Sequence, residues 1–485
     1  MTFWSVVAHY HFERLTFLDN ASLLIESPTT PMHVAAISTF EMGPLERPDG
    51  GLDIDRIREF VASKLHRIPR YRQKLAWVPL EQQPVWVDDH HFNIHYHVRH
   101  TALPRPGDER QLKRLAARVM AQHLDRSKPL WELWFVEGLE HADRFAMIQK
   151  FHHCMVDGAA AVALMDVLLD HRPTTDFPPA PRWVPRPEPT AWELAADAVG
   201  RYLRLPAEIA GLAPGLLDGA SALRERVRAL ADTARSTTAL PDATPINQRI
   251  GPHRRFDWLS MDLAAIKAVK GRLGGTVNDV LLATVAGAMR RFLERRGVRT
   301  EGLDFRVMAP VNVRSASERT APGNRVSAWM VPLPIAEPDP VKRVEAVRAA
   351  TRALKDSHQA LGADTLMQVL DHVPAPLLAF AVPQVAHRLL AANLVVTNVP
   401  GSREPLYLLG AKMLDTYGFI PLSDYLCLNI VLFSYVDALH WGFVGEWDLV
   451  PDLHDFVDDV RVAFQQLVDA VALQPDGAAS RTRAP

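Results

Sequence analysis

The sequence predicts a mixed α/β protein built from two similar units, and three observations support this. Its 485 residues exceed what one hydrophobic core comfortably organises, so two units of roughly 200 residues each are expected. Strand-like and helix-like patterns alternate in both halves of the chain, an order typical of sheets flanked by helices. A proline-rich stretch, residues 172–189, separates the halves.

The composition is that of an ordinary globular protein. Hydrophobic residues make up 48% of the chain and charged residues 23%, and the net charge of -2 argues against nucleic acid as a partner. The only cysteines, Cys154 and Cys427, offer no disulfide framework and fit a reducing compartment. No basic, apolar leader opens the chain, and no apolar run approaches the ~20 residues that cross a bilayer. We therefore expect a cytoplasmic protein with at most peripheral membrane contact.

The first unit, residues 1–171, contains the most informative segment. Residues 144–151 alternate apolar and polar side chains as a strand does, and residues 159–169 are rich in alanine and leucine and predict a helix. His152 and His153 lie at the junction between these two elements.

A linker and helical bridge, residues 172–244, are expected between the units. Seven prolines in residues 172–189 exclude a helix or a central strand there. Apolar spacing predicts helices over residues 190–236, interrupted near Pro206 and Pro214-Gly215. Six arginines balance six acidic residues in these helices, which favours packing against the two units over binding to anionic lipid, although a lipid surface stays possible.

The second unit, residues 245–473, has its own strands and helices, and residues 474–485 form a small, polar tail that we expect to be disordered. The patterns predict strands at 305–310, 326–332, 394–397 and 426–434, and helices at 277–296, 340–361 and 453–472.

The histidine pair suggests proton transfer in an acylation. A hydroxyl is a poor nucleophile at neutral pH, and one neutral imidazole that removes its proton accelerates attack by ~10²- to 10⁴-fold. Asp157 and Gly158 follow the pair; we expect the aspartate to brace the loop through an arginine and the glycine to permit close backbone approach. The candidate arginines are Arg255, Arg306 and Arg314.

Two other interpretations of the pair remain open. His152 and His153 could be satisfied polar residues of a loop, with Asp157 stabilising the first turn of the next helix. They could also bind zinc with the aspartate, but neither the usual helical spacing of two ligands nor a convincing third ligand accompanies them.

Three further motifs have structural and functional interpretations. Asn278 and Asp279 follow Thr276 at a helix start, where Asp279 suits capping and Asn278 suits contact with substrate or oxyanion. Thr397 and Asn398 end an apolar strand before Pro400-Gly401 and could donate hydrogen bonds near a thioester or form a turn. The third motif, Pro129-Leu130-Trp131, has the composition of core packing.

His152-His153-x-x-x-Asp157-Gly158 resembles the HHxxxDG signature of the CoA-dependent acyltransferase superfamily. That superfamily includes chloramphenicol acetyltransferases, condensation domains and the bacterial wax ester synthase/diacylglycerol acyltransferases. Other segments, spread between Leu15 and Leu473, are similar to the last family in its order. They are residues 15–19, 31–33, 129–131, 137–139, 278–283, 322–325 and 397–401.

The resemblance implies two CoA-dependent acyltransferase-like subdomains, each a mixed sheet flanked by helices, that meet at a central tunnel. It implies that His153 is the general base, that His152 shapes the site and that Asp157 is structural, and it moves Pro129-Leu130-Trp131 towards lining a substrate channel. The reaction implied moves a long acyl chain from acyl-CoA to diacylglycerol or a long-chain alcohol, without a covalent intermediate, a cofactor or a metal. Such substrates imply peripheral association with a membrane or lipid inclusions.

Two positions depart from the family pattern: Thr397 replaces a usual serine, and Asp437 stands where glycine is common. Both should preserve the fold, whereas the choice of acceptor could change. Two rival functions stay open: an acyltransferase that takes a carrier-protein thioester in polyketide or peptide lipid synthesis, and a non-catalytic protein that binds acyl-CoA or lipid.

Overall fold

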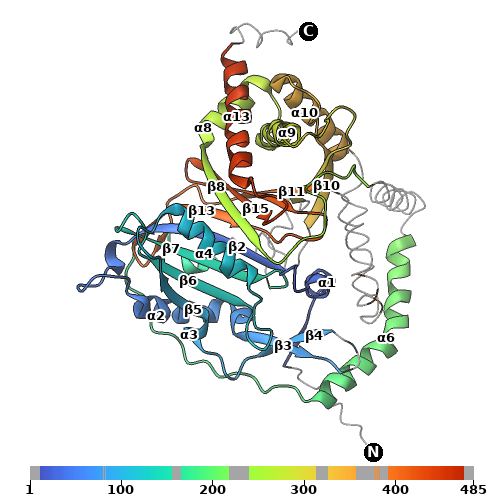
Figure 1. The fold of residues 1–485 in the computed structure, drawn as a ribbon. Helices are drawn as coiled ribbons and strands as arrows, with labels where there is room; N and C mark the ends of the chain where they lie inside the picture. The colour runs from blue at the N-terminus through green and yellow to red at the C-terminus, as the bar shows by residue number, and fades with distance from the viewer. Residues whose placement is uncertain are drawn as a thin grey trace, which may run out of the picture.

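The computed structural model contains two six-stranded sheets and one small three-stranded sheet, with helices on their outer faces and between them (Figure 1). It describes residues 11–79, 81, 83–155, 165–217, 240–312, 326–356, 377, 380, 382 and 392–473. Several predicted features lie outside the described residues: the tail 474–485, residues 322–325, Asp157, Gly158 and Arg314.

The N-terminal half supplies four strands of the first sheet, whose order is β12-β13-β2-β7-β6-β5. Its elements are β1 (Glu13–Arg14), α1 (Phe17–Ile25), β2 (His33–Glu41), α2 (Ile54–Lys64), β3 (Gln73–Trp77), β4 (Pro84–Asp88), α3 (Ile94–His97), β5 (Val98–Ala102), α4 (Glu109–Ala121), β6 (Trp131–Glu137) and β7 (Arg144–His152). Short 3-10 turns occupy Gly43–Leu45, Leu65–Arg67 and Pro69–Arg72.

Strand β7 is the innermost strand of this half. It pairs antiparallel with β2 on one side and with β6 on the other, and every residue after Arg144 is buried. The register places His33 opposite His152 and Trp131 opposite Phe151. Because both edges of β7 are hydrogen-bonded, the position of its last residue is fixed from two sides.

Helix α4 lies between the first sheet and the second. Asp108 and Gln111 form a capping box at its start, which satisfies backbone N–H groups that the first turn leaves open. Its apolar face, including Leu112, Ala116 and Met120, joins a hydrophobic core that also contains Trp258 of the second sheet. One continuous core therefore spans both halves of the chain.

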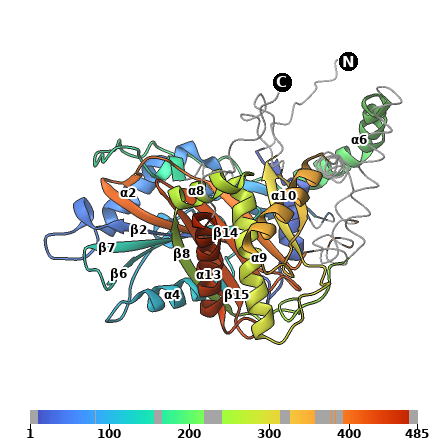
Figure 2. The same ribbon diagram turned by 90° about the horizontal axis from the view of Figure 1, so that it is seen from above.

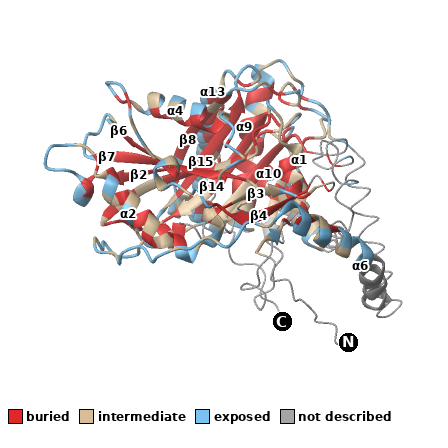
Figure 3. Cartoon of the chain, turned by 90° about the horizontal axis from the view of Figure 1, so that it is seen from below, coloured by how far each residue is buried: buried red, intermediate tan, exposed pale blue. Residues whose placement is uncertain are grey.

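The C-terminal half forms the second sheet, β10-β9-β11-β14-β15-β8, and covers it with helices (Figure 2). Its elements are β8 (Arg254–Asp262), α8 (Leu263–Leu273), α9 (Val277–Arg295), β9 (Arg306–Asn312), β10 (Val326–Pro332), α10 (Pro340–Asp356), β11 (Leu394–Pro400), β12 (Tyr407–Leu408), β13 (Ala411–Phe419), β14 (Leu428–Tyr435), β15 (Ala438–Glu446) and α13 (Leu453–Ala472). Strand β11 runs parallel to β9 and β14 while the other neighbours are antiparallel, so the sheet is mixed as predicted. Buried residues concentrate in the two sheets and in α9 (Figure 3).

Two strands of the C-terminal half, β12 and β13, join the first sheet. Strand β13 follows β11 in the chain but pairs with β2 of the first sheet, and β12 extends that edge. Strand β13 also touches the second sheet, because a Cβ built on Gly442 of β15 would lie 2.0 Å from the carbonyl oxygen of Gly418 in β13. Only glycine permits this approach. The domain boundaries at residues 171 and 244 stay a prediction. The pairing of β13 with β2 shows in addition that the first sheet contains strands from both halves of the chain.

Most predicted elements of the second half are confirmed, with ends that agree within a few residues. Residues 173–190 have no regular secondary structure, as the prolines predict, and residues 165–168 are helical within the predicted helix 159–169. The predicted breaks at Pro206 and Pro214 are wrong, since α6 (Ala191–Leu217) continues through both. A proline removes one helical hydrogen bond, and a long helix can absorb that loss as a bend. Within the described parts of the chain, the helices are too short or too polar to span a bilayer.

Replacement of Gly442 by alanine tests the contact between the sheets. The added methyl would overlap the Gly418 carbonyl, so the strands must separate, and we expect the free energy of unfolding to fall by about 1–3 kcal/mol or more. Thermal denaturation measures this loss. As a control, Gly271→Ala in α8 adds a methyl to open space and should stabilise the helix slightly; equal melting temperatures for the two variants would contradict the proposed packing.

Candidate active site

The histidine pair lies where β7 ends. The His152 N–H donates to the Leu130 carbonyl at 3.0 Å, and the His153 N–H donates to the Met32 carbonyl at 2.8 Å. The chain then turns, with the Met155 N–H bonded to the His152 carbonyl at 2.9 Å. Neighbouring strands on both sides therefore hold the backbone of the pair. Asp157 and Gly158 lie outside the described residues, and their roles stay predictions.

The two histidines have different environments. The His152 side chain is 1% exposed, and its Nδ1 accepts a hydrogen bond from the Cys154 N–H at 3.1 Å. Since Nδ1 is the acceptor, the neutral ring carries its proton on Nε2. His153 is only partly buried. Of the pair, His153 is the residue whose side chain is not enclosed in the core.

A polar cluster with a buried centre surrounds the His152 ring, and most of its members could not be identified from the sequence. We define the cluster as Glu26, His33, His123, Arg126 and His152. The ring of His33 lies 5.9 Å from the ring of His152, as expected for residues opposite each other on paired strands. The carboxylate of Glu26 lies within 4.0 Å of a ring nitrogen of each of the three histidines. Residue spacing alone could not reveal this cluster, because its members come from four separate segments.

Neither cysteine is suited to act as a nucleophile. Cys154 is 3% exposed, and burial raises the pKa of its thiol well above the ordinary value. Burial also raises the pKa of Cys427 to about 11. Both therefore remain thiols at neutral pH, as expected for a reaction without a cysteinyl intermediate.

Pro129, Leu130 and Trp131 are buried beside the pair and support it. Leu130 supplies the carbonyl that binds the His152 N–H, and its side chain packs in a small core with Cys154. The Trp131 indole N–H donates to the Tyr71 carbonyl at 2.8 Å. Leu130 and Trp131 have no exposed surface. These contacts are structural, and contact of the motif with substrate stays a prediction.

Asn278 and Asp279 begin α9, and the predicted capping box is confirmed. Asp279 Oδ2 accepts from the N–H and the hydroxyl of Thr276 at 2.7 and 2.8 Å, and Oδ1 accepts from the Thr351 hydroxyl at 2.7 Å. Both carboxylate oxygens are thus engaged in the fold. Asn278 is partly buried, and its role at the active site stays a prediction.

Thr397 and Asn398 are partly buried in the second half of β11, a central strand of the second sheet. Gly401 follows, where a Cβ would lie 2.3 Å from the Ser434 carbonyl oxygen. This close approach gives Gly401 a structural reason to be glycine. The structure therefore shows how the end of β11 is held against β14, while hydrogen bonding of Thr397 or Asn398 to a thioester stays a prediction.

Two candidate arginine partners of Asp157 already have other contacts. Arg255 donates to the Trp447 carbonyl at 2.9 Å and stacks on its ring, and Arg306 pairs with Asp304 at 2.5 Å. A pairing of either residue with Asp157 stays a prediction.

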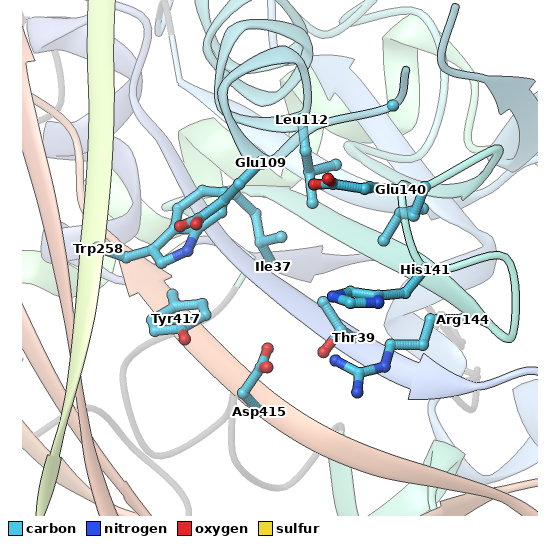
Figure 4. A pocket seen from close by; sticks show the side chains of 12 residues that line it. Ile37, Thr39, Glu109, Leu112, Glu140, His141, Arg144, Trp258, Asp415 and Tyr417 are labelled. Atoms are coloured by element: carbon cyan, nitrogen blue, oxygen red, sulfur yellow. The ribbon is translucent and has the colours of Figure 1, made fainter. Parts of the chain in front are cut away.

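A separate cavity of about 270 Å³ lies between β2, β13 and β8. The Asp415 carboxylate points into it (Figure 4), and burial raises the pKa of that carboxyl. Arg144, another lining residue, begins β7, whereas His152 ends it. Ile37 of β2 also lines the cavity and pairs with Ile148, so at ~3.3 Å per residue the cavity extends from roughly 13 to 26 Å from His152 along β7 and is not the histidine site.

Comparison with solved structures defines the class. The chain superposes with a TM-score of 0.59 on the first condensation domain of the calcium-dependent antibiotic synthetase, which is 16% identical over 95% of this chain and 96% of that one. At that identity the likeness shows the fold alone. The TM-score is 0.69 for the wax ester synthase/diacylglycerol acyltransferase from Marinobacter aquaeolei VT8, 25% identical over 95% of this chain and 100% of that one. The fold is thus the two-subdomain fold of acyltransferases and condensation domains.

Sequence comparison then identifies the family. Residues 15–281 match the wax ester synthase/diacylglycerol acyltransferase catalytic domain, and residues 322–468 match the C-terminal domain of that family. Two Mycobacterium tuberculosis proteins named as diacylglycerol O-acyltransferases are similar: one is 31% identical over 96% of this chain and 92% of its own, the other 32% over 84% and 86%. The chain belongs to the wax ester synthase/diacylglycerol acyltransferase family and is an acyltransferase.

Substitutions of Asp279 and Asn278 distinguish a residue that caps α9 from one that contacts substrate. Asp279→Asn removes the charge that holds Thr276 and Thr351, so we expect a loss of about 1–3 kcal/mol in unfolding free energy. Asn278→Ala should leave the melting temperature nearly unchanged and lower kcat by about tenfold or more if Asn278 stabilises the oxyanion. Denaturation and steady-state kinetics measure the two effects. Full activity in Asn278→Ala would remove this residue from the catalytic set.

Proposed function

We propose that this enzyme transfers a long acyl chain from acyl-CoA to the hydroxyl of diacylglycerol or of a long-chain alcohol. The observation that carries the proposal is the asymmetry of the pair in a chain of this family: His152 is enclosed in the core, whereas His153 follows it, partly exposed, at the end of β7. The names of the similar proteins, which mention diacylglycerol and wax esters, support these acceptors.

In the proposed mechanism His153 acts directly on the acceptor. Its neutral imidazole removes the hydroxyl proton as the oxygen attacks the thioester carbonyl, and a tetrahedral intermediate forms. Collapse of this intermediate breaks the C–S bond and expels the CoA thiolate, which takes the proton back from the imidazolium. Atoms and charges balance in these steps, and no acyl-enzyme intermediate is needed. The raised pKa of the Cys154 thiol supports this, because a protonated thiol is a poor nucleophile. A tunnel between the subdomains, through which both substrates reach His153, is part of the proposal.

The variant His153→Ala tests the assignment. Purified enzyme is supplied with palmitoyl-CoA and either hexadecanol or dioleoylglycerol, and release of CoA and formation of ester are followed. We expect kcat to fall by about 10²- to 10⁴-fold in the variant, because no other base replaces the imidazole. His95→Ala, an exposed histidine on α3, is the matched control and should keep full activity.

Two outcomes would contradict the proposal. Equal CoA release by wild type and His153→Ala would remove His153 from catalysis. Absence of ester with both acceptors in the wild type would favour the rival interpretations, a carrier-protein thioester as donor or a non-catalytic binding protein. Palmitoyl-phosphopantetheine on a carrier protein then distinguishes those two.

We also propose that α6 places the enzyme on a lipid surface. One face of the helix, with Leu194 and Ala198, packs against valines of β4. The opposite face carries Trp192, Val199 and Leu203, which are 80%, 58% and 76% exposed. These three lie at spacings of seven and four residues, so they form one apolar stripe. The acceptors are insoluble lipids, and an apolar stripe on an exposed helix is typical of interfacial binding.

A triple serine variant tests this contact. Trp192→Ser/Val199→Ser/Leu203→Ser removes the stripe, and we expect the partition coefficient onto phosphatidylcholine vesicles containing dioleoylglycerol to fall by about tenfold or more. Sedimentation measures binding, and transfer of the acyl group to hexanol in detergent should persist. Val184→Ser/Leu473→Ser, which removes side chains 70% and 84% exposed elsewhere, is the control. Equal binding by both variants would contradict the proposal.

A further inference from the structure

The carboxylate of Glu26 is the centre of the polar cluster defined above, which also contains His33, His123, Arg126 and His152. Glu26 ends helix α1 at the C-cap position, and its side chain is only 6% exposed. Arg126 donates to Oε2 from Nε at 3.1 Å and from Nη2 at 2.5 Å. The Met32 N–H donates to Oε1 at 3.2 Å. A buried carboxylate with this many donors is favoured in its ionised form.

The three histidines of the cluster complete the surroundings of Glu26. His152 Nε2 lies 3.4 Å from Oε2, while His123 Nδ1 and His33 Nε2 lie 3.3 and 3.7 Å from Oε1. Burial raises the pKa of the Glu26 carboxyl, but the contacts with His152, Arg126 and His33 outweigh it and hold that pKa well below its usual range. These contacts therefore favour the ionised form of Glu26 at neutral pH.

The hydrogen bonds of His152 direct its proton towards Glu26. Because Nδ1 accepts from the Cys154 N–H at 3.1 Å, the proton of the neutral ring is on Nε2. That nitrogen is buried and makes no hydrogen bond to a described residue, but it lies 3.4 Å from Glu26 Oε2. The Cys154 N–H thus sets the tautomer of His152, and the negative charge of Glu26 stabilises the Nε2–H that faces it.

Glu26 also holds the strand that binds His153. Met32 has two backbone contacts: its N–H donates to Glu26, and its carbonyl accepts the His153 N–H at 2.8 Å. The same carboxylate therefore contacts the residue before His153 and the residue hydrogen-bonded to it. We propose that Glu26, with Arg126 as its counter-charge, is a positioning residue that sets the place and the electrostatic environment of the His153 imidazole. This inference rests on the proposed role of His153 as the base.

A metal site is the other use that this cluster could have. Glu26, His33 and His123 place ligand-type atoms within 4.8 Å of one another. Two contacts favour the ion-pair network instead. Arg126 already neutralises the carboxylate, and His33 Nε2, the ring nitrogen that faces Glu26, accepts from the Leu124 N–H at 3.4 Å. Zinc binding is therefore an outcome of the test, not the proposal.

The pH dependence of kcat reports on the network. Among the described residues, the charged or titratable groups that interact with Glu26, His33 or Cys154 are Asp19, Arg70, His123, Arg126, Lys150 and His152, together with these three groups themselves. Removing the Glu26 anion destabilises an imidazolium at His153, so the acidic limb of the profile should move to lower pH. Removing the Arg126 cation does the opposite, so the limb should move to higher pH. A purely structural role would not produce opposite shifts.

The test compares Glu26→Gln and Arg126→Gln with the wild-type enzyme. We expect kcat to fall about 10- to 100-fold in Glu26→Gln, with KM for palmitoyl-CoA and the acceptor within about threefold, since the binding surfaces are unchanged. The two acidic limbs should shift in opposite directions. Glu81→Gln is the matched control, because Glu81 is 2% exposed and pairs with Arg14 away from the loop; it should cost stability and leave the profile unchanged.

The other outcomes are decisive. Unchanged kcat and pH profile in Glu26→Gln, or shifts in the same direction for both variants, would overturn the inference while leaving His153 as base. Loss of wild-type activity on treatment with a chelator and recovery with Zn²⁺ alone would overturn it in favour of a metal site. An active His153→Ala enzyme would instead refute the proposed base. If Glu26→Gln does not fold, Arg126→Gln alone tests the inference. Because the Arg126 side chain is 35% exposed, we expect its replacement to be tolerated by the fold.

Discussion

The pairing of β7 on both edges is the constraint on which the site depends. Strand β2 holds one edge and β6 the other, and the last residue of β7 is His152. A strand at the edge of a sheet can fray at its end, whereas a strand paired on both sides cannot separate without breaking two ladders. The hydrogen bonds continue one residue past the strand, where the Met32 carbonyl binds His153. A base that must approach a hydroxyl within hydrogen-bond distance needs a backbone held in this way.

The exchange of β13 ties that constraint to the second subdomain. Since β13 pairs with β2, and β2 pairs with β7, the C-terminal half is hydrogen-bonded to the sheet that carries the histidines. The contact between Gly418 and Gly442 brings the backbones of β13 and β15 together without side chains between them. In the proposed arrangement, substrates between the two subdomains would meet surfaces whose separation is set by backbone contacts. Such contacts deform less than a layer of side chains.

The sequence predicts local structure well here and long-range partnership poorly. Helix α13 follows from periodicity because one face of it is buried, and helix α9 follows from its long apolar run, which is buried on every side from Asp279 to Met289. The proline-rich segment is irregular because proline cannot join a ladder. Periodicity does not state which strand pairs with which, so the crossing of β13 was not predictable. Glu26 was missed for the same reason: an isolated acid at a helix end has the pattern of a solvated residue, and only the fold brings Arg126 to it, 100 positions further along the chain.

The geometry of a strand end supports the unequal roles that we propose for the two adjacent histidines. Side chains alternate between the faces of a strand, so His152 shares a face with the buried Lys150 and lies opposite His33. On that face it meets the carboxylate of Glu26 and is held in one tautomer. The next residue, His153, follows where β7 ends and is only partly buried. A histidine at 152 alone would be fixed but enclosed; a histidine at 153 alone would be accessible but next to a residue with no anchor. The order of the pair along the chain therefore supports the proposed division, in which the first imidazole anchors and the second transfers the proton.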